Sequence, residues 1–409
     1  MGILKEVMKR VAPSHSSLQA AWIFEAKSPI LAPPLVFGAE KNIAFGTKDG
    51  RLVCISATGV QLWEYTVEHK LSKVDMMFVD EESVKSISSM PAYLSKEKFL
   101  LFGTDSGILQ AVTESGKPQW QFKAKGPIKT TPLVADINGD GKEEVIFGSL
   151  DKYLYALNGE GKLIWAFNAG SQIESSPSYF RSRAGYGIVF GANNGTLYCL
   201  GGDGKEKWSF ATKSPITATP SCGLILGSED IFIAFGGHDS TAYILSEKGL
   251  KEWQFKTGGK ILASISLADV NTDSRMEVCI GSTDDTLYLL SAQGGKLWQF
   301  ESNFWIVAKP LIADLNRDGN LEIAVGSYDR FVYILSAEGE YVLDSMPGLS
   351  NLTSDIQNNS GLINAPAGRY QSKIIASYKT RGMVTGLSLH EYSGLLVTTS
   401  SGTLEALKL

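Results

Sequence analysis

Short apolar runs separated by Gly, Asp, Asn and Ser recur along almost the whole chain. Residues 131–167 show the unit most clearly, because the apolar stretches TPLVADI, EVIFGS, YLYALN and LIWAF are separated by NGDGKE, LDK and GEGK. Alternating or continuous apolar runs of this length, bounded by turn-forming residues, are typical of β-strands joined by tight loops. The pattern therefore predicts a unit of four antiparallel strands.

This unit is repeated, and seven of the eight copies have an aromatic pair of the type WxF or WxY in the fourth strand. The tryptophans of these pairs recur at intervals of 41 to 57 residues and are Trp22, Trp63, Trp120, Trp165, Trp208, Trp253 and Trp298. A second signature of the type FGSLDKYLYALN lies between the pairs, and TTSSGTLEALKL is its eighth and weakest copy. A period of 40–50 residues with four strands each indicates a β-propeller. We predict an all-β, eight-bladed β-propeller over residues 20–409, with the tryptophans packed between blades.

The two ends of the repeat are incomplete in a complementary way. The first strand, around Trp22, has no preceding strands of its own blade, and the last strand, LEALKL, has no following one. An unpaired strand edge invites aggregation, so a ring that closes on itself is favoured. We predict that the N-terminal strand joins the last blade as its outer strand.

Two insertions and a tail interrupt the repeat. Residues 67–85 extend the link between two blades, and residues 340–372 fall in the seventh blade. Aligning Ala376–Thr380 with the other outer strands places the second insertion between the third and fourth strands; alternatively, the strand at Tyr341 is the fourth. Either choice leaves blade seven without a tryptophan, so we predict that it is the weakest blade. Residues 1–19 have apolar positions at helical spacing, which suits either a docked tail or a helix that binds a membrane surface or a partner.

Composition excludes several classes of protein. A net charge of −5 argues against a nucleic-acid partner, which would require a basic face. No apolar run approaches 18 residues, so we expect no transmembrane segment. The four cysteines stand in separate apolar runs and are predicted to be buried free thiols. The N-terminus lacks the apolar core of a signal peptide, which predicts a cytoplasmic protein, or an extracytoplasmic one if a leader has been removed. We also expect the ring to be monomeric.

Three loops between first and second strands share an acidic pattern: DINGDGKEE, DVNTDSRME and DLNRDGNLE. Oxygen-bearing side chains occupy positions 1, 3, 5 and 9 of each loop, and a backbone carbonyl at position 7 would add another ligand. Calcium takes six to eight oxygen ligands, which alternate residues of a tight loop can supply. The alternative is a loop that is merely rich in turn-forming residues. The predicted ligands are Asp136, Asn138, Asp140, Lys142 and Glu144; Asp269, Asn271, Asp273, Arg275 and Glu277; and Asp314, Asn316, Asp318, Asn320 and Glu322.

The inner strands, which line the channel of a propeller, begin with a motif close to PIxxxP. Most residues that follow the apolar position are small or hydroxylated, and Lys129, Glu174 and Lys309 are the charged exceptions. Phe304 and Trp305 also depart from the pattern, since Trp305 stands where other copies have proline. We predict that these five residues contact a ligand or a protein partner; the alternative for Trp305 is local packing against the next blade.

No catalytic constellation is visible. The four histidines show no metal-binding spacing, and neither a GxSxG motif nor a Gly-rich phosphate loop is present. In a repeat protein, chemistry should appear as a deviation in one copy, and His238 is the only deviation of that kind. We therefore name no catalytic residue and expect a protein that is not an enzyme.

The unit GSLDKYLYALNGEGKLIWAF resembles the pyrrolo-quinoline-quinone-like (PQQ-like) repeat, and the match covers nearly all of residues 20–409. The resemblance implies an eight-bladed propeller with tryptophan docking between blades. The acidic loops resemble the calcium loops of FG-GAP repeats, which often have Asp where Glu144, Glu277 and Glu322 stand. Quinoprotein dehydrogenases carry an adjacent pair of cysteines that this chain lacks, so PQQ is not expected as a cofactor.

The resemblance thus implies the non-catalytic branch, a scaffold that binds a protein or peptide partner and holds calcium in a structural role. Two other functions stay open. One is a quinoprotein-type dehydrogenase or another enzyme at the channel mouth, and the other is a carbohydrate or small-ligand sensor. WD repeats have a similar period, but their tryptophan ends the third strand, whereas here it lies in the fourth.

Overall fold

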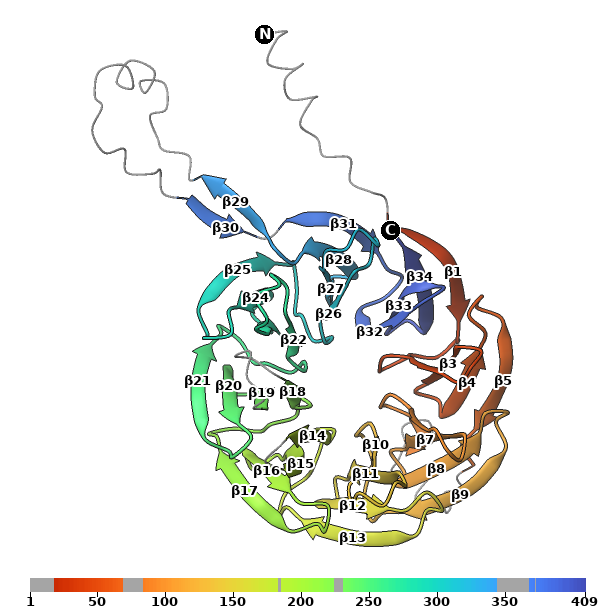
Figure 1. Ribbon diagram of the computed structural model, residues 1–409. Helices are drawn as coiled ribbons and strands as arrows, with labels where there is room; N and C mark the ends of the chain where they lie inside the picture. Colours follow the sequence, from red (N-terminus) through yellow and green to blue (C-terminus); the bar gives the residue numbers. More distant parts are fainter. Residues whose placement is uncertain (1–17, 69–83, 183–184, 224–230, 344–367, 372) are drawn as a thin grey trace, which may run out of the picture.

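Eight four-stranded antiparallel sheets surround a central channel in the computed structural model (Figure 1). The structure describes residues 18–68, 84–182, 185–223, 231–343, 368–371 and 373–409. Within these ranges the regular structure is all strand, apart from two helical residues at 84–85. The predicted eight-bladed β-propeller is confirmed.

Blades one to seven follow one another along the chain, each from the inner to the outer strand. Blades one to four contain β2 (Leu35–Phe37), β3 (Asn42–Gly46), β4 (Arg51–Ile55) and β5 (Gln61–Thr66); β6 (Ala92–Leu94), β7 (Phe99–Gly103), β8 (Ile108–Thr113) and β9 (Pro118–Lys123); β10 (Leu133–Ala135), β11 (Glu144–Gly148), β12 (Tyr153–Leu157) and β13 (Leu163–Asn168); and β14 (Ser178–Ser182), β15 (Gly185–Gly191), β16 (Thr196–Leu200) and β17 (Glu206–Ala211). Blades five to seven contain β18 (Ser221–Gly223), β19 (Phe232–Gly236), β20 (Thr241–Ser246) and β21 (Lys251–Lys256); β22 (Ser266–Ala268), β23 (Glu277–Gly281), β24 (Thr286–Leu290) and β25 (Lys296–Glu301); and β26 (Leu311–Ala313), β27 (Glu322–Gly326), β28 (Phe331–Ser336) and β31 (Ile374–Lys379).

Burial follows from the position of a strand in its blade. The second strand β11 is buried at all five positions, whereas the outer strand β13 alternates between exposed and half-buried side chains. A middle strand is covered on both faces by the neighbouring blades, so both of its faces must be apolar. An outer strand turns one face to solvent, which explains the period of two in sequences such as LIWAFN.

The ring closes as predicted. Blade eight contains β32 (Val384–His390), β33 (Gly394–Thr399), β34 (Thr403–Lys408) and, as its outer strand, β1 (Gln19–Glu25). β1 pairs antiparallel with β34 from Gln19–Lys408 to Glu25–Thr403. The first and last strands that the structure describes therefore share one sheet, and the hydrogen bonds between β1 and β34 close the ring.

Strand pairing in the seventh blade decides between the two alignments of its insertion. β31 pairs with β28 as the fourth strand, with Ile334 opposite Ala376. The strands β29 (Glu340–Leu343) and β30 (Gly368–Gln371) pair with each other and lie between the third and fourth strands in sequence. The insertion therefore splits these two strands, and the strand at Tyr341 is not the outer strand of the blade. Residues 344–367 and 69–83, the centres of the two insertions, and the predicted helix within residues 1–19, lie outside the described residues except for 18–19.

The repeated tryptophans dock between blades, as predicted. Trp253 donates a hydrogen bond from its indole Nε1 to the carbonyl oxygen of Ala292 in the next blade, at 3.0 Å. Its ring covers Gly294, where a Cβ atom would lie 2.8 Å from the ring and φ is +84°. The other six indoles make the same bond to the next blade, in the pairs Trp22–Ala57, Trp63–Glu114, Trp120–Gly159, Trp165–Gly202, Trp208–Glu247 and Trp298–Ala337.

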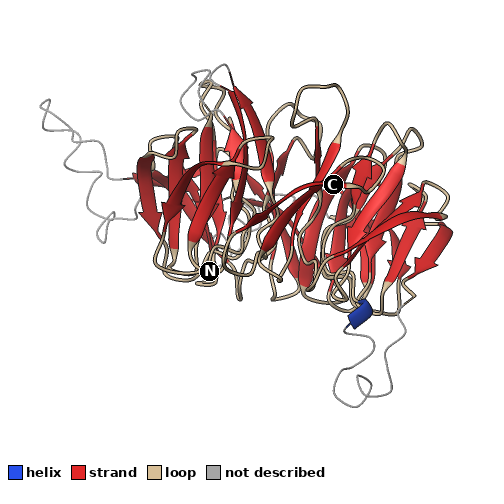
Figure 2. Ribbon diagram, turned by 90° about the horizontal axis from the view of Figure 1, so that it is seen from below, coloured by secondary structure: helices blue, strands red, loops and turns tan. Residues whose placement is uncertain are grey.

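The antiparallel connections give the ring two different faces, seen edge-on in Figure 2. The loops between first and second strands and the turns that receive the tryptophans lie at one face, which we call the loop face. The turns between second and third strands and the links between blades lie at the other, which we call the mouth face. The helical residues 84–85 belong to the mouth face, because Lys85 contacts Gly50 in such a turn.

Candidate functional site

All eight blades contribute side chains to the central channel, which holds a cavity of about 650 Å³. The extended segment that leads into each inner strand starts at the mouth face with a buried aliphatic residue, such as Ile128 or Ile306. Because alternate residues of an extended chain face opposite sides, the next residue and the third one line the cavity. The residues nearest the mouth, here called the first ring, are Leu31, Ser88, Lys129, Glu174, Thr217, Leu262, Val307 and Thr385. The second ring lies two residues deeper and contains Pro33, Met90, Thr131, Ser176, Thr219, Ser264, Lys309 and Leu387.

The two charges of the first ring differ in how they interact with the protein. Glu174 accepts a hydrogen bond at its Oε1 from the side-chain amide of Asn193, at 2.8 Å. Lys129 acts on Asp105 of the preceding blade: burial raises the pKa of Asp105, and the lysine charge opposes part of that increase. The hydrogen bond therefore holds Glu174 in place at the mouth, while Lys129 interacts with Asp105 only through its charge.

His238 also belongs to this polar part of the mouth. Its Nε2 lies 3.0 Å from the hydroxyl oxygen of Thr217 in the first ring. Burial, together with the nearby charge of Lys260, lowers the pKa of His238 below its usual value. The imidazole is therefore neutral at neutral pH, where it can both donate and accept a hydrogen bond.

The mouth is apolar over blades seven, eight and one. Phe304 and Trp305 are 44% and 43% exposed, and their rings stack with centroids 5.3 Å apart. Their backbone is fixed, since the carbonyl oxygen of Trp305 accepts a hydrogen bond from the backbone N–H of Tyr328 at 3.0 Å. Met383 from blade eight and Leu31 from blade one are each 37% exposed. We call Leu31, Phe304, Trp305 and Met383 the apolar sector.

Lys309 differs from the other two charged residues of the channel. Its side chain lines the second ring and is reached by solvent, yet the channel wall surrounds it closely enough to lower its pKa by desolvation. Within the part of the chain that the structure describes, no carboxylate lies within ion-pair distance of its ammonium group and no hydrogen bond forms there.

The three acidic loops lie at the loop face, on the opposite side of the ring from the mouth, and share one geometry. In the first loop the two carboxylate oxygens of Asp136 accept hydrogen bonds from the backbone N–H groups of Gly139 at 2.7 Å and Gly141 at 3.0 Å. Although desolvation opposes it, these N–H donors lower the pKa of Asp136. Asn138 and Asp140 each accept from the N–H two residues later, at 2.8 Å.

The glutamate at position 9 turns inward. Glu144 is only 3% exposed and accepts bonds from the N–H of Ile137 at 3.0 Å and from the amide of Asn138 at 3.1 Å. Burial raises its pKa, and the charges of the two loop aspartates add to the increase. Glu277 and Glu322 make the same contacts in their loops, and their pKa values are raised in the same way.

The loop oxygens are of the hard type that calcium prefers, but they are occupied with the backbone of the loop. Among the described residues, no group of three or more His, Cys, Asp or Glu side chains is positioned to hold a metal ion. In this arrangement the loops are stabilised without a cation, by their own N–H groups. The residues therefore have suitable donor chemistry without forming a coordination shell.

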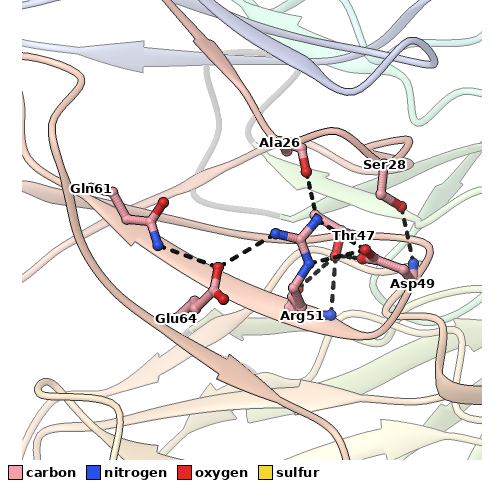
Figure 3. A network of polar contacts seen from close by, with 7 residues as sticks. All are labelled: Ala26, Ser28, Thr47, Asp49, Arg51, Gln61 and Glu64. Carbon is pink, nitrogen blue, oxygen red and sulfur yellow. Dashed lines mark hydrogen bonds and ion pairs between the residues drawn. The ribbon is translucent and has the colours of Figure 1, made fainter.

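A further polar cluster at the mouth face is structural. Arg51 on β4 donates from its Nε to Asp49 at 3.0 Å, forms an ion pair with Glu64 at 3.4 Å, and also donates to the carbonyl oxygen of Ala26 (Figure 3). Burial opposes it, but hydrogen bonds from Thr47 and from Arg51 lower the pKa of Asp49. Since Ala26 follows β1, the network connects blade one to the outer strand of blade eight. It strengthens the closed ring.

The structure brings together some of the residues singled out in the sequence and separates others. Lys129, Glu174 and Lys309 line one cavity, and Phe304 and Trp305 lie beside its mouth, while the loop carboxylates occupy the opposite face. Sequence reasoning missed Leu31 and Met383. Met383 stands at the position equivalent to Trp305, directly before the buried residue that starts the channel segment, and this register could have revealed it.

The cysteines are free thiols, as predicted, and no disulfide is formed among them. Cys54, Cys199 and Cys279 are buried and Cys222 is half-buried. They belong to four different blades, so the channel offers no adjacent pair of the kind that quinoprotein dehydrogenases carry. Over the described residues, no helix has the length and hydrophobicity needed to cross a membrane.

Solved structures with a similar fold match between 78% and 96% of the chain. BamB from Moraxella catarrhalis is 14% identical, with a TM-score of 0.67 over 96% of this chain and 100% of its own. Sqt1 from Saccharomyces cerevisiae is 11% identical, with a TM-score of 0.67 over 96% and 99%. BBS1N, solved in complex with ARL6DN, is 12% identical, with a TM-score of 0.53 over 78% and 90%. At these identities the similarity shows the fold alone.

The comparison with curated proteins gives no significant match. Among protein families, the λ-carrageenase β-propeller domain matches residues 101–177, 186–252 and 247–348, which together form more than half of the chain. The matched residues run from the second blade to just beyond the third strand of the seventh, and they include the acidic loops, Trp305 and Lys309. On the strength of this match and of the blade architecture, the chain belongs to the family of λ-carrageenase-type β-propeller domains.

Proposed function

We propose that the chain is a non-enzymatic binding scaffold of the PQQ-like type, which recognises a protein or peptide partner at the mouth face. The observation that supports this most directly is the apolar sector. Its aromatic pair is exposed and stacked on a fixed backbone, next to a cavity. Buried aromatic anchors at the centre of a patch provide most of the energy in protein interfaces.

The arrangement of the apolar sector fits an interface better than local packing. An exposed Trp or Phe usually occurs singly on a protein surface, and grouped exposed apolar residues mark interaction sites. Here four such residues come from three adjacent blades. The other half of the mouth is polar and contains Lys129, Glu174 and His238. A partner that buries the apolar sector would find polar groups for its rim, as protein interfaces require.

Structural relatives support a role in binding. BBS1N was solved in complex with ARL6DN, so a propeller with this architecture does hold a protein partner. The low identity means that the partner itself does not transfer to this chain. A cytoplasmic location and a monomeric state remain predictions from the sequence.

Affinity capture with matched variants tests this function. The wild-type protein, Trp305→Ala and Phe304→Ala are used as baits, with Tyr392→Ala as the control, because Tyr392 is 65% exposed in a hairpin at the loop face. We expect a specific protein to be retained by the wild type and by the control and to be lost with both aromatic variants. Equal recovery with all four baits would refute the role of the apolar sector. A glycan array with the same proteins tests the carbohydrate alternative.

We also propose calcium binding at the acidic loops, as a property separate from partner binding. The support is the oxygen chemistry of Asp136, Asn138, Asp140 and the Lys142 carbonyl, and its repetition in two further loops. Calcium would supply charge compensation for three carboxylates in one loop, and the chain would hold it with groups that now cap the backbone. Calorimetry with calcium, and melting in calcium against EDTA, should show heat and a higher melting temperature; Asp136→Asn should reduce both. The absence of heat and of a melting shift would reject calcium binding.

A further inference from the structure

The channel has a positive charge that the protein itself does not neutralise. Of its three charged lining residues, Glu174 is held by Asn193 and the charge of Lys129 acts on Asp105, whereas among the described residues no carboxylate acts on Lys309 in this way. The channel wall lowers the pKa of Lys309 by desolvation, although part of the side chain stays open to solvent. A cation that lines a cavity and has no counter-charge beside it favours the binding of an anion from solution.

The second ring adds hydrogen-bond donors around this charge. Thr131, Thr219 and Ser264 line the cavity, and in the described structure their hydroxyl groups form no hydrogen bond with protein atoms. The hydroxyl oxygen of Ser176 already accepts a bond from the backbone N–H of Thr131, at 2.8 Å, which leaves its proton free to be donated. Four hydroxyls from blades three to six therefore face the same cavity as Lys309.

This donor set selects the chemistry of the ligand. An ammonium group can only donate, and the hydroxyls can donate as well, so the best complement is a group that only accepts, with a single negative charge. A carboxylate is such a group. The other side of the second ring is apolar, with Pro33, Met90 and Leu387, and suits a short hydrocarbon body beside the carboxylate. A volume of about 650 Å³ lies within the usual range for small-molecule sites, ~300–1,000 Å³.

We propose that the central channel binds carboxylate ligands, with Lys309 as the charge partner and the second-ring hydroxyls as hydrogen-bond donors. The ligand is a small organic carboxylate that enters from the mouth, or the terminal carboxylate of a polypeptide that reaches into the channel. Both sources present the same chemical group to Lys309. The inference is independent of the apolar sector, since none of the residues involved belongs to it.

Calorimetric titration of the full chain with butyrate, and with butyramide as the uncharged analogue, tests the chemistry. A second arm uses an N-acetylated alanine tetrapeptide with a free C-terminus, and its C-terminal amide. We expect millimolar binding of at least one carboxylate probe and none of its amide. Binding of butyrate assigns the site to small molecules, and binding of the peptide alone assigns it to chain termini.

Variants locate the site. Lys309→Met keeps the length of the side chain and should weaken binding by about tenfold or more, as expected for loss of a charge-assisted hydrogen bond. Lys129→Met is the matched control in the first ring and should change affinity by less than about threefold. Ser264→Ala, which removes a single donor and leaves the charge, should weaken binding by about threefold to tenfold and serves if Lys309→Met does not fold.

Specific labelling of the lysine side chains gives a second measurement. A bound carboxylate should raise the pKa of Lys309, which NMR titration can follow with and without butyrate. Trp305→Ala should leave butyrate binding intact, so that failure of the proposed partner face and failure of this site can be told apart. No binding of either carboxylate, equal binding of the amides, or an equal loss with Lys129→Met would overturn the proposal.

Discussion

Two kinds of contact between blades meet in one ring. From blade eight through blade one to blade seven, an indole of one blade covers a turn of the next, as Trp253 covers Gly294. Between blades seven and eight, Ala376 occupies the register of the tryptophan and is buried. A cavity of about 420 Å³ lies at this seam, lined by Ile334 opposite Ala376, and by Leu18 and Leu409 from the two ends of the chain.

The seam also differs in its inner layer. At the contact between blades five and six, Phe255 and Tyr288 form an edge-to-face pair with centroids 5.3 Å apart. At the seam, Tyr378 takes the place of the phenylalanine and Glu405 that of the tyrosine. Glu405 is completely buried, and one of its carboxylate oxygens has no hydrogen-bond partner among the described atoms. The seam therefore combines a missing indole with a buried carboxylate.

The comparison shows why blade seven has no tryptophan. An indole needs an acceptor carbonyl and a glycine in the turn between the third and fourth strands of the next blade. Blade eight has no such turn, because its third strand is the C-terminal β34 and its fourth strand is the N-terminal β1. Closing the ring with the two ends of the chain thus removes the docking site that every other contact uses.

The largest difference should appear on removing an indole. Trp298 is 2% exposed and bonded to Ala337, so Trp298→Ala should reduce the free energy of unfolding by about 3–5 kcal/mol. Trp305→Ala, at an exposed tryptophan outside the contacts, should change it by less than about 0.5 kcal/mol. Urea denaturation of both variants measures the difference. Similar losses for the two would show that the indoles do not hold the blades together.

A smaller effect is expected at the glycine beneath an indole. Gly294→Ala forces a left-handed residue and a clash with Trp253, and should cost about 3 kcal/mol. Gly170→Ala is the control, since φ there is +73° but no atom lies within 4 Å of the added Cβ, and it should cost about 1 kcal/mol. Thermal or urea unfolding of the pair isolates the contribution of the clash. Equal costs would mean that the glycine serves the turn alone.

The seam should open more easily than the other contacts. We expect backbone amides of β31 to exchange with solvent at least about tenfold faster than those of β25, the corresponding outer strand of blade six. The reason is that β31 lacks an indole anchored in the next blade. Hydrogen exchange resolved by residue measures this, and uniform protection across all eight blades would contradict the prediction that blade seven is weakest.

The smallest effect concerns a feature that both kinds of contact share. Burial, with Asp284 beside Tyr288 and Glu405 beside Tyr378, raises the pKa of each of these tyrosines to about 12. An unfolded tyrosine ionises near pH ~10, so the stability that these groups contribute is complete below pH ~10 and is lost as the pH rises towards about 12. Tyr288→Phe and Tyr378→Phe should each flatten the alkaline part of the stability curve. An unchanged slope in both variants would show that neither tyrosine is linked to folding.

Much of the architecture could be predicted because repetition averages out local ambiguity. Seven tryptophans in one register identified the outer strands, and the incomplete first and last units identified the closure. The seventh blade was ambiguous because Ala376 lacks the marker that defines the register elsewhere. Met383 was missed for a similar reason, since the eighth copy is degenerate and few positions align it.

The candidate sites were predicted less completely, because their properties depend on what surrounds each side chain. The sequence placed Lys309 in the channel, but only the structure shows that Asn193 holds Glu174 and that no carboxylate among the described residues acts on Lys309. The sequence also predicted oxygen ligands in the acidic loops. The structure directs those oxygens, such as the buried pair on Glu144, to N–H groups of the loop itself.

By itself the sequence determined the repeat, the number of blades and the way the ring closes, since each of these depends on local patterns that occur many times. The tertiary structure alone decided which of the unusual residues act together. Phe304 and Trp305 join Leu31 and Met383 only because the ring brings the first, seventh and eighth blades side by side. Lys309 shares a cavity with hydroxyls of four other blades for the same reason: a closed ring brings its inner strands around one axis, which no local pattern encodes.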